Sequence, residues 1–134
     1  MGEQFGDRWD LNELVEENLI DHSRVTLPNI GGITELKKIV ALCETHYVGM
    51  IPHFTGPIST AALVHVLASS SGFIMTEITR DAPIKTKYLN DDYVSFKNGK
   101  LYPNERAGLG VKFIPGNVEL VNVIAEPSLT ITLC

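Results

Sequence analysis

The chain is poor in cysteine, in basic side chains and in long apolar runs. Its 134 residues include two cysteines, Cys43 and Cys134, which are too few for a disulfide scaffold. Eleven Lys and Arg residues against sixteen Asp and Glu residues give a net charge of −5, whereas a nucleic-acid surface needs a basic patch. No apolar run approaches the roughly 18 residues that a membrane helix needs. We therefore expect no nucleic-acid or membrane partner, and the few cysteines fit a reducing cytoplasm.

Apolar periodicity divides the first half of the chain into alternating helices and strands. Helical spacing of apolar residues predicts three helices, over residues 10–19, 33–47 and 58–66. Asp10 and Glu13 resemble a capping box that would open the first helix. Short apolar runs between the helices predict strands at residues 23–27, 48–52 and 73–76. Strands that alternate with helices form parallel βαβ units, so the fold class is α/β.

The pattern changes after Glu77, where no good helical periodicity follows. Asn98-Gly99 separates two short β-prone runs and is a strong signal for a hairpin turn. Gly108-Leu109-Gly110-Val111 predicts a tight turn, and residues 118–134 are rich in β-branched side chains. We therefore divide the chain into a βα part at residues 1–90 and a hairpin with a tail at residues 91–134.

Three polar residues directly follow short runs that we interpret as strands. They are Glu3, His53 and Glu77. Because the carboxyl ends of parallel strands meet at one rim of a sheet or barrel, we expect these three side chains to gather there. Two carboxylates and an imidazole at one rim can serve a metal ion and a proton transfer.

Five short motifs occur in a specific order along the chain. They are Gly2-Glu3, Gly31-Gly32-Ile33-Thr34-Glu35, Pro52-His53, Gly56-Pro57 and Gly108-Leu109-Gly110-Val111. This set resembles the C-terminal part of an enolase-superfamily protein of the mandelate racemase/muconate lactonizing enzyme-like branch. Within that branch it is most similar to the acid-sugar dehydratases for galactonate, gluconate and mannonate. The resemblance implies the C-terminal portion of a (β/α)7β TIM-like barrel, whose C-terminal β-hairpin tail packs on a separate capping domain.

The resemblance also implies a role for each candidate site residue. Glu3 resembles the third carboxylate ligand of an essential Mg²⁺, and His53 resembles the acid/base histidine. Glu77 resembles the acid that hydrogen-bonds the substrate carboxylate or the enediolate. Arg80 is either a contact to the sugar acid or a surface residue. The implied reaction abstracts a proton next to a carboxylate and then eliminates water, and histidine can protonate the leaving hydroxyl because it titrates near neutrality.

Two departures from the family pattern shape the expectation. The family uses three carboxylate ligands, and only Glu3 is present, although one carboxylate holds Mg²⁺ poorly. A whole barrel takes roughly 250 residues, so we expect a fragment, a truncated product or one piece of a split enzyme. In addition, Thr26 stands where many relatives carry an aspartate that orients the histidine. His53 would then act as an acid or a substrate binder, with the base outside this chain.

Two classes of function follow. In the first, the chain derives from or completes a Mg²⁺-dependent acid-sugar dehydratase, or a racemase or cycloisomerase of the same superfamily, and pairs with a complementary N-terminal chain. In the second, it is a catalytically inactive remnant that self-associates or acts as an interaction module. An open half barrel favours pairing with another chain in either case, because it exposes a sheet edge and apolar interior.

Overall fold

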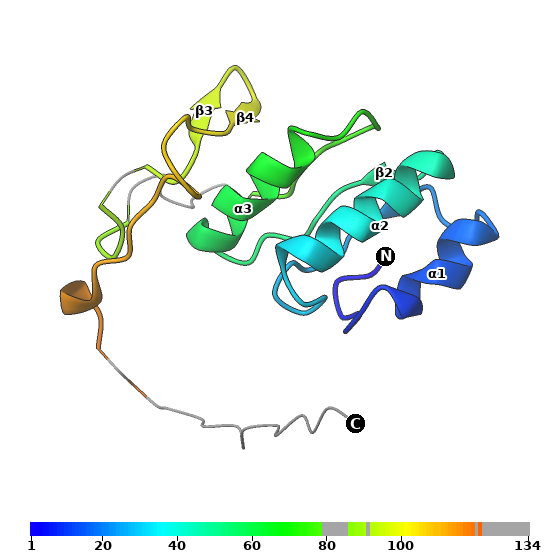
Figure 1. Cartoon of the computed structure of the whole chain (residues 1–134), viewed down its shortest axis with the longest axis horizontal. Helices are drawn as coiled ribbons and strands as arrows, with labels where there is room; N and C mark the ends of the chain where they lie inside the picture. Colours follow the sequence, from blue (N-terminus) through cyan, green and yellow to red (C-terminus); the bar gives the residue numbers. More distant parts are fainter. Residues whose placement is uncertain (79–85, 91, 120, 122–134) are drawn as a thin grey trace, which may run out of the picture.

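The structure is a computed structural model in which residues 1–78, 86–90, 92–119 and 121 are described. Its helices are α1 (Trp9–Glu16), α2 (Ile33–Thr45), α3 (Pro57–Leu67) and a short 3-10 helix (Pro115–Asn117). Its strands are β1 (His22–Ser23), β2 (Gly49–Met50), β3 (Ser95–Lys97) and β4 (Lys100–Tyr102). Strands and helices alternate through α3, and the hairpin of β3 and β4 follows at the other end of the molecule (Figure 1).

Four extended segments form one parallel sheet. Its hydrogen bonds extend beyond the two-residue bounds of β1 and β2. β1 pairs in parallel with β2, and Met50 bridges in parallel to Ile74. Met1 joins the free edge of β1, since its amine lies 3.4 Å from the His22 carbonyl and its own carbonyl accepts from the Arg24 amide at 2.7 Å. Further amide-to-carbonyl bonds extend the ladder: Ile51 to Ser23, His53 to Val25, and Glu77 to Pro52. The predicted strands are thus confirmed as parallel neighbours in chain order.

The helices cover one face of this sheet. Side chains alternate between the two faces of a strand, and the helix-facing residues of the second and third segments are buried: Ser23, Val25, Leu27, Val48, Met50 and Pro52. They meet the apolar stripes of the helices in one core, which includes Leu11 and Val15 of α1, Leu36, Ile39, Val40 and Cys43 of α2, and Leu63 of α3. On the opposite face Phe73 and Met75 stay 58% and 48% exposed.

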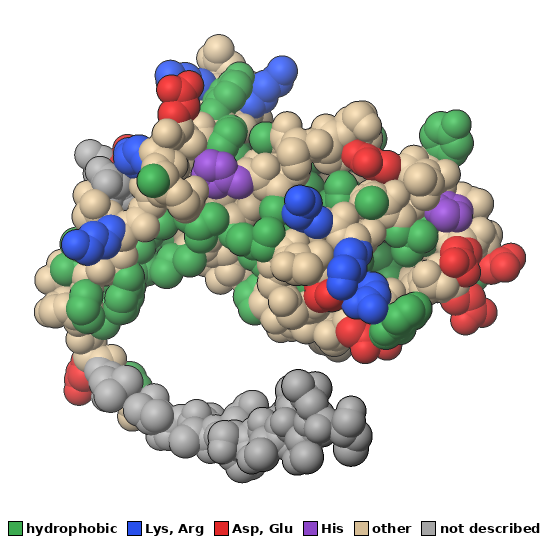
Figure 2. All heavy atoms as spheres, in the orientation of Figure 1, with side chains coloured by type: hydrophobic (Ala, Val, Ile, Leu, Met, Phe, Trp, Pro, Cys, Tyr) green, Lys and Arg blue, Asp and Glu red, His purple; other side chains and the backbone are tan. Residues whose placement is uncertain are grey.

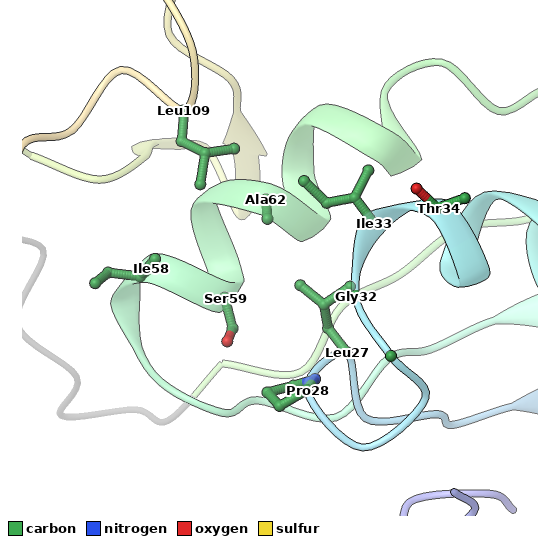
Figure 3. A pocket seen from close by; sticks show the side chains of 10 residues that line it. Leu27, Pro28, Gly32, Ile33, Thr34, Ile58, Ser59, Ala62 and Leu109 are labelled. Carbon is green, nitrogen blue, oxygen red and sulfur yellow. The ribbon is translucent and has the colours of Figure 1, made fainter. Parts of the chain in front are cut away.

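A second apolar cluster joins the C-terminal part to α3. Ala61 and Val64 of α3 pack with Leu89, Tyr93 and Val94. Leu109 packs against both this cluster and the main core. It also lines an apolar cavity of about 390 Å³ between the N-terminal ends of α2 and α3 (Figure 3). The loop that carries Leu109 therefore ties the hairpin region to the βα layer.

The hairpin forms as the sequence predicted. β3 and β4 are antiparallel, with Ser95 opposite Tyr102. Asn98 and Gly99 both have positive φ, 51° and 74°, as a type I′ turn requires. Of the tail, only Val118, Glu119 and Val121 belong to the described residues after the 3-10 helix, so its β-rich pattern lies mostly outside them.

Two helix boundaries differ from the prediction. α1 begins at Trp9 and ends at Glu16, so Leu19 lies outside it and is 62% exposed. Its first amides are capped by Asp7, whose Oδ1 accepts from the amides of Trp9 and Asp10, rather than by Asp10. α2 ends at Thr45, and Tyr47, predicted to lie on its apolar stripe, is 98% exposed with a φ of 59°. The left-handed conformation at Tyr47 turns its side chain away from the core.

Charge is unevenly spread over the visible surface. Acidic side chains gather at the end of the molecule that carries α1 (Figure 2). Within the part of the chain that the structure describes, no helix has the length and apolar content that a membrane crossing needs.

The core predicts a clear contrast between two positions of α3. Leu63 is fully buried, so Leu63→Ala should lower the free energy of unfolding by about 2–5 kcal/mol, because it removes apolar contacts and leaves a cavity. Ile58 lies in the same helix but is 42% exposed, so Ile58→Ala should cost less than about 1 kcal/mol. Urea denaturation of both variants measures the difference, and equal losses would contradict this assignment of the core.

Candidate functional site

Four side chains, one from each parallel segment, form a cluster on the sheet. Glu3, Arg24, His53 and Glu77 each come from a different segment, in the order of the sheet. Arg24 lies between the two acids: its Nη1 forms an ion pair with Glu3 Oε2, and its Nη2 donates to Glu77 Oε2 at 2.7 Å. The four side chains are between 31% and 44% exposed, so the cluster is open to a ligand.

The local fold explains why these side chains converge. Arg24 stands between buried Ser23 and Val25, and alternation along the strand therefore turns it to the face away from the helices. His53 follows buried Pro52, and its amide donates to the Val25 carbonyl at 2.9 Å. The Glu77 amide donates to the Pro52 carbonyl at 3.2 Å, which sets Glu77 beside His53.

The contacts of His53 indicate which ring nitrogen carries hydrogen. Nδ1 lies 2.7 Å from Glu77 Oε2 and 2.9 Å from Arg24 Nη2. A carboxylate only accepts and a guanidinium only donates, so one ring nitrogen cannot satisfy both. Arg24 Nη2 already donates to Glu77 Oε2, and the consistent arrangement has Nδ1–H also donating to that oxygen. Nε2 then remains available, because no described residue forms a hydrogen bond with it.

The surroundings of Glu77 favour its ionised form. The hydrogen bond from His53 is the largest cause that lowers the pKa of this carboxyl, and the Phe54 amide at 3.3 Å and the charge of Arg24 act in the same direction. Partial burial works against them by raising the pKa, but the net shift is downward. Glu77 is therefore a carboxylate at neutral pH, suited to accept hydrogen bonds and to stabilise a protonated His53.

A shallow cavity adjoins Glu3 and Arg24. Its volume is about 320 Å³, and it is lined by Arg24 and by the N-terminal residues Met1, Gly2, Glu3, Gln4 and Phe5. This hollow includes Glu3 and Arg24, whereas the 390 Å³ cavity beside Leu109 holds none of the four clustered residues. Of these two cavities, the rim cavity beside Glu3 and Arg24 is thus the one that adjoins the cluster.

The described residues do not complete a magnesium site. They contain no group of three His, Cys, Asp or Glu side chains arranged to hold a metal ion. Glu3 offers one hard oxygen ligand and Glu77 is engaged by Arg24 and His53. Since Mg²⁺ requires near-octahedral oxygen coordination, its other protein ligands would have to come from elsewhere.

Sequence reasoning located three of the four clustered residues. Glu3, His53 and Glu77 lie together as their positions after the strands predicted, whereas Arg80 lies outside the described residues. Arg24 was missed, although a single cation inside the short run at residues 23–27 was a usable signal. Thr26 does not contact His53; its hydroxyl donates to the Glu3 carbonyl at 2.6 Å.

The shifted pKa of Glu77 makes stability depend on pH. Because folding lowers this pKa, the carboxylate stabilises the fold above the unfolded value of about 4.3, and the contribution is lost as pH falls through the lower folded value. Wild type should therefore exceed Glu77→Gln in stability at pH 7, and the gap should narrow between pH 5 and pH 3. Urea denaturation across that range measures the gap. Glu13→Gln on exposed α1 is the control, and a gap for Glu77→Gln that is constant with pH would contradict the assignment.

Comparison with known proteins agrees with this geometry. Residues 1–116 match the family described as Enolase C-terminal domain-like. A D-mannonate dehydratase of Caulobacter sp. (strain K31) is 40% identical over 114 residues, which cover 83% of this chain and 28% of that protein. A D-galactonate dehydratase family member of Streptomyces bingchenggensis is 32% identical, covering 84% of this chain and 28% of that protein. The chain thus spans less than a third of the relatives it matches.

Solved structures give the same result. An enolase from Pantoea ananatis, crystallised with D-gluconate and Mg, superposes with a TM-score of 0.77 at 30% identity, covering 87% of this chain and 29% of that one. A putative galactarate dehydratase from Agrobacterium radiobacter, with Na and L-malate bound, gives a TM-score of 0.73 at 28% identity, covering 87% and 33%. The predicted barrel portion is confirmed, and this chain belongs to the enolase superfamily, in which it corresponds to a part of the C-terminal barrel domain of mandelate racemase/muconate lactonizing enzyme-like proteins.

Proposed function

We propose that this chain supplies the C-terminal part of the active site of a Mg²⁺-dependent acid-sugar dehydratase. The observation that carries the proposal is the cluster of Glu3, Arg24, His53 and Glu77, one from each of four neighbouring parallel segments. Relatives named as mannonate and galactonate dehydratases support the substrate class of small sugar acids. In such a reaction the proton next to the carboxylate is removed, and the hydroxyl on the neighbouring carbon leaves as water.

His53 is the acid in this scheme. In its protonated form Nδ1–H donates to Glu77, and no described residue forms a hydrogen bond with Nε2–H. The Nε2 proton passes to the departing hydroxyl, which leaves as water while the electrons of the former C–H bond form the C=C bond. Glu77 holds the ring in one orientation and stabilises its positive charge. The base that takes the proton next to the carboxylate lies outside this chain.

Arg24 and Glu3 have separate roles in binding the negatively charged substrate. The guanidinium of Arg24 can bind a carboxylate with two parallel hydrogen bonds, and the cavity at the rim lies directly beside it. Glu3 would contribute one ligand to Mg²⁺, which would supply positive charge beside the substrate carboxylate when bound. The remaining ligands would come from strands of the parent barrel. Arg80, just beyond Glu77, is proposed as a further contact to the sugar acid.

The same proposal covers the partners of the chain. Residues 1–90 would form the last strands and helices of the barrel, and residues 91–134 would pack as a hairpin and tail on a capping domain. The complementary N-terminal part, on its own chain or on a longer parent, completes the metal site, so the 134-residue chain alone is inactive. We propose a cytoplasmic location for the enzyme.

Complementation tests this function. The chain is combined with the N-terminal part of a dehydratase relative, and a panel of sugar acids is assayed with Mg²⁺ for the 2-keto-3-deoxy product. His53→Asn should lower the rate by about 10²–10⁴-fold, the usual contribution of a general acid, while His46→Asn at the end of α2 should not. Absence of product from a complex shown to be folded, or activity unchanged by His53→Asn, would overturn the proposal.

A second candidate function rests on the exposed face of the sheet. Phe73 and Met75 are about half exposed on the side that no described helix covers, and such apolar surface favours association. Under this second function the chain is a catalytically inactive module that pairs with a second copy. Within the first, enzymatic function, a racemase or cycloisomerase is the alternative to a dehydratase.

Self-association is open to direct measurement. If the exposed face mediates it, the chain should sediment as a dimer or larger species, and Met75→Asp should shift it toward the monomer by placing a charge in the interface. Tyr47→Asp, at a 98% exposed position beyond α2, is the matched control. A wild-type chain that is monomeric at micromolar concentration would contradict this second function.

A further inference from the structure

The main chain of Glu3 is held by two side chains of the following βα unit. Thr26 Oγ1 donates to the Glu3 carbonyl oxygen at 2.6 Å, and Asn29 Nδ2 donates to the same oxygen at 3.1 Å. A carbonyl oxygen has two lone pairs, so both bonds can form together. No other described side chain forms a hydrogen bond with the main chain of residues 1–5.

The anchor and the ion pair come from one short stretch of chain. Thr26 lies two residues after Arg24, so the two side chains project from the same face of the extended segment toward Glu3. Thr26 is only 4% exposed, whereas the Glu3 side chain is 44% exposed. The buried hydroxyl therefore fixes the direction in which Glu3 leaves the main chain, and Arg24 receives its carboxylate.

Thr26 serves Glu3 and forms no hydrogen bond with His53. His53 Nδ1 is engaged by Glu77 at 2.7 Å, so the ring has its acidic partner on the next segment. The hydroxyl of Thr26 bonds Glu3 instead. The Thr26 hydroxyl thus supports the main chain of the candidate metal ligand, while Glu77 supports the histidine.

We propose that Thr26 and Asn29 are positioning residues that set the Glu3 carboxylate against Arg24. The proposal rests on the proposed function of Glu3 for its catalytic meaning. An exposed glutamate at the end of an edge segment would otherwise sample several rotamers, and ordering it beforehand removes that entropic cost when a cation or substrate binds.

Nuclear magnetic resonance of the 134-residue chain tests the proposal without any assay of activity. The side-chain carboxyl of Glu3 is observed with ¹³C-labelled glutamate and assigned with Glu3→Gln. In the otherwise wild-type chain, the substitution Arg24→Gln should shift this resonance, because the ion pair between Arg24 and Glu3 is lost. In Thr26→Val and Asn29→Ala the resonance should already lie near the position seen in Arg24→Gln, and adding Arg24→Gln should move it little further. Thr26→Ser, which keeps the hydroxyl, should restore the wild-type position.

The controls separate positioning from general stability. Thr45→Val removes a hydroxyl that bonds main-chain carbonyls at the end of α2, and it should leave the Glu3 resonance unchanged. Asn29 is exposed, so Asn29→Ala tests the proposal even if Thr26→Val does not fold. A Glu3 resonance that stays at its wild-type position in Asn29→Ala, and still responds fully to Arg24→Gln, would overturn the proposal. A positive result in a chain that fails the complementation assay would refute only the proposed function.

Discussion

The guanidinium of Arg24 lies between two carboxylates that come from opposite edges of the four-segment sheet. Glu3 and Glu77 would repel each other at this rim without a cation between them. Arg24 pairs with both, and the His53 ring adds a donor on the side of Glu77. Two negative charges therefore face one permanent positive charge and one that depends on the protonation of His53. The charges of the cluster balance when His53 holds its second proton, which is the state that an acid catalyst needs.

The sheet supports this cluster from one side only. Three helices bury the residues that point away from the site, and the alternation of the strands then turns Arg24 and His53 to the other face. Phe73 and Met75 share that face and stay about half exposed. The sheet face that the helices leave uncovered therefore carries both the charged cluster and exposed apolar side chains. Both proposed functions, catalysis by a completed barrel and self-association of this chain, depend on this one face.

The described C-terminal residues pack on the helices that cover the sheet. Leu109 touches both apolar clusters and lines the cavity that also touches the N-terminal ends of α2 and α3 (Figure 3). Those ends follow the segments that carry Thr26 and His53. Asn104 and Arg106 bond the main chain of the same loop, at the carbonyls of Leu109 and Gly110, so the position of Leu109 is fixed locally before it packs.

Much of this was determined by the sequence alone. Apolar periodicity located the three helices and the parallel segments, Asn98-Gly99 specified the hairpin, and the residues after the strands named Glu3, His53 and Glu77, because these signals depend on neighbours along the chain. Other features were decided only by tertiary structure. The end of α1 and the exposure of Tyr47 depend on what the core has room to bury. Two contacts of the site depend on distances across the sheet: Arg24 lies between two acids, and Thr26 bonds Glu3 rather than His53. The residues that meet are far apart in the chain, with 53 positions between Arg24 and Glu77 and 23 between Thr26 and Glu3. No local sequence pattern encodes such distances.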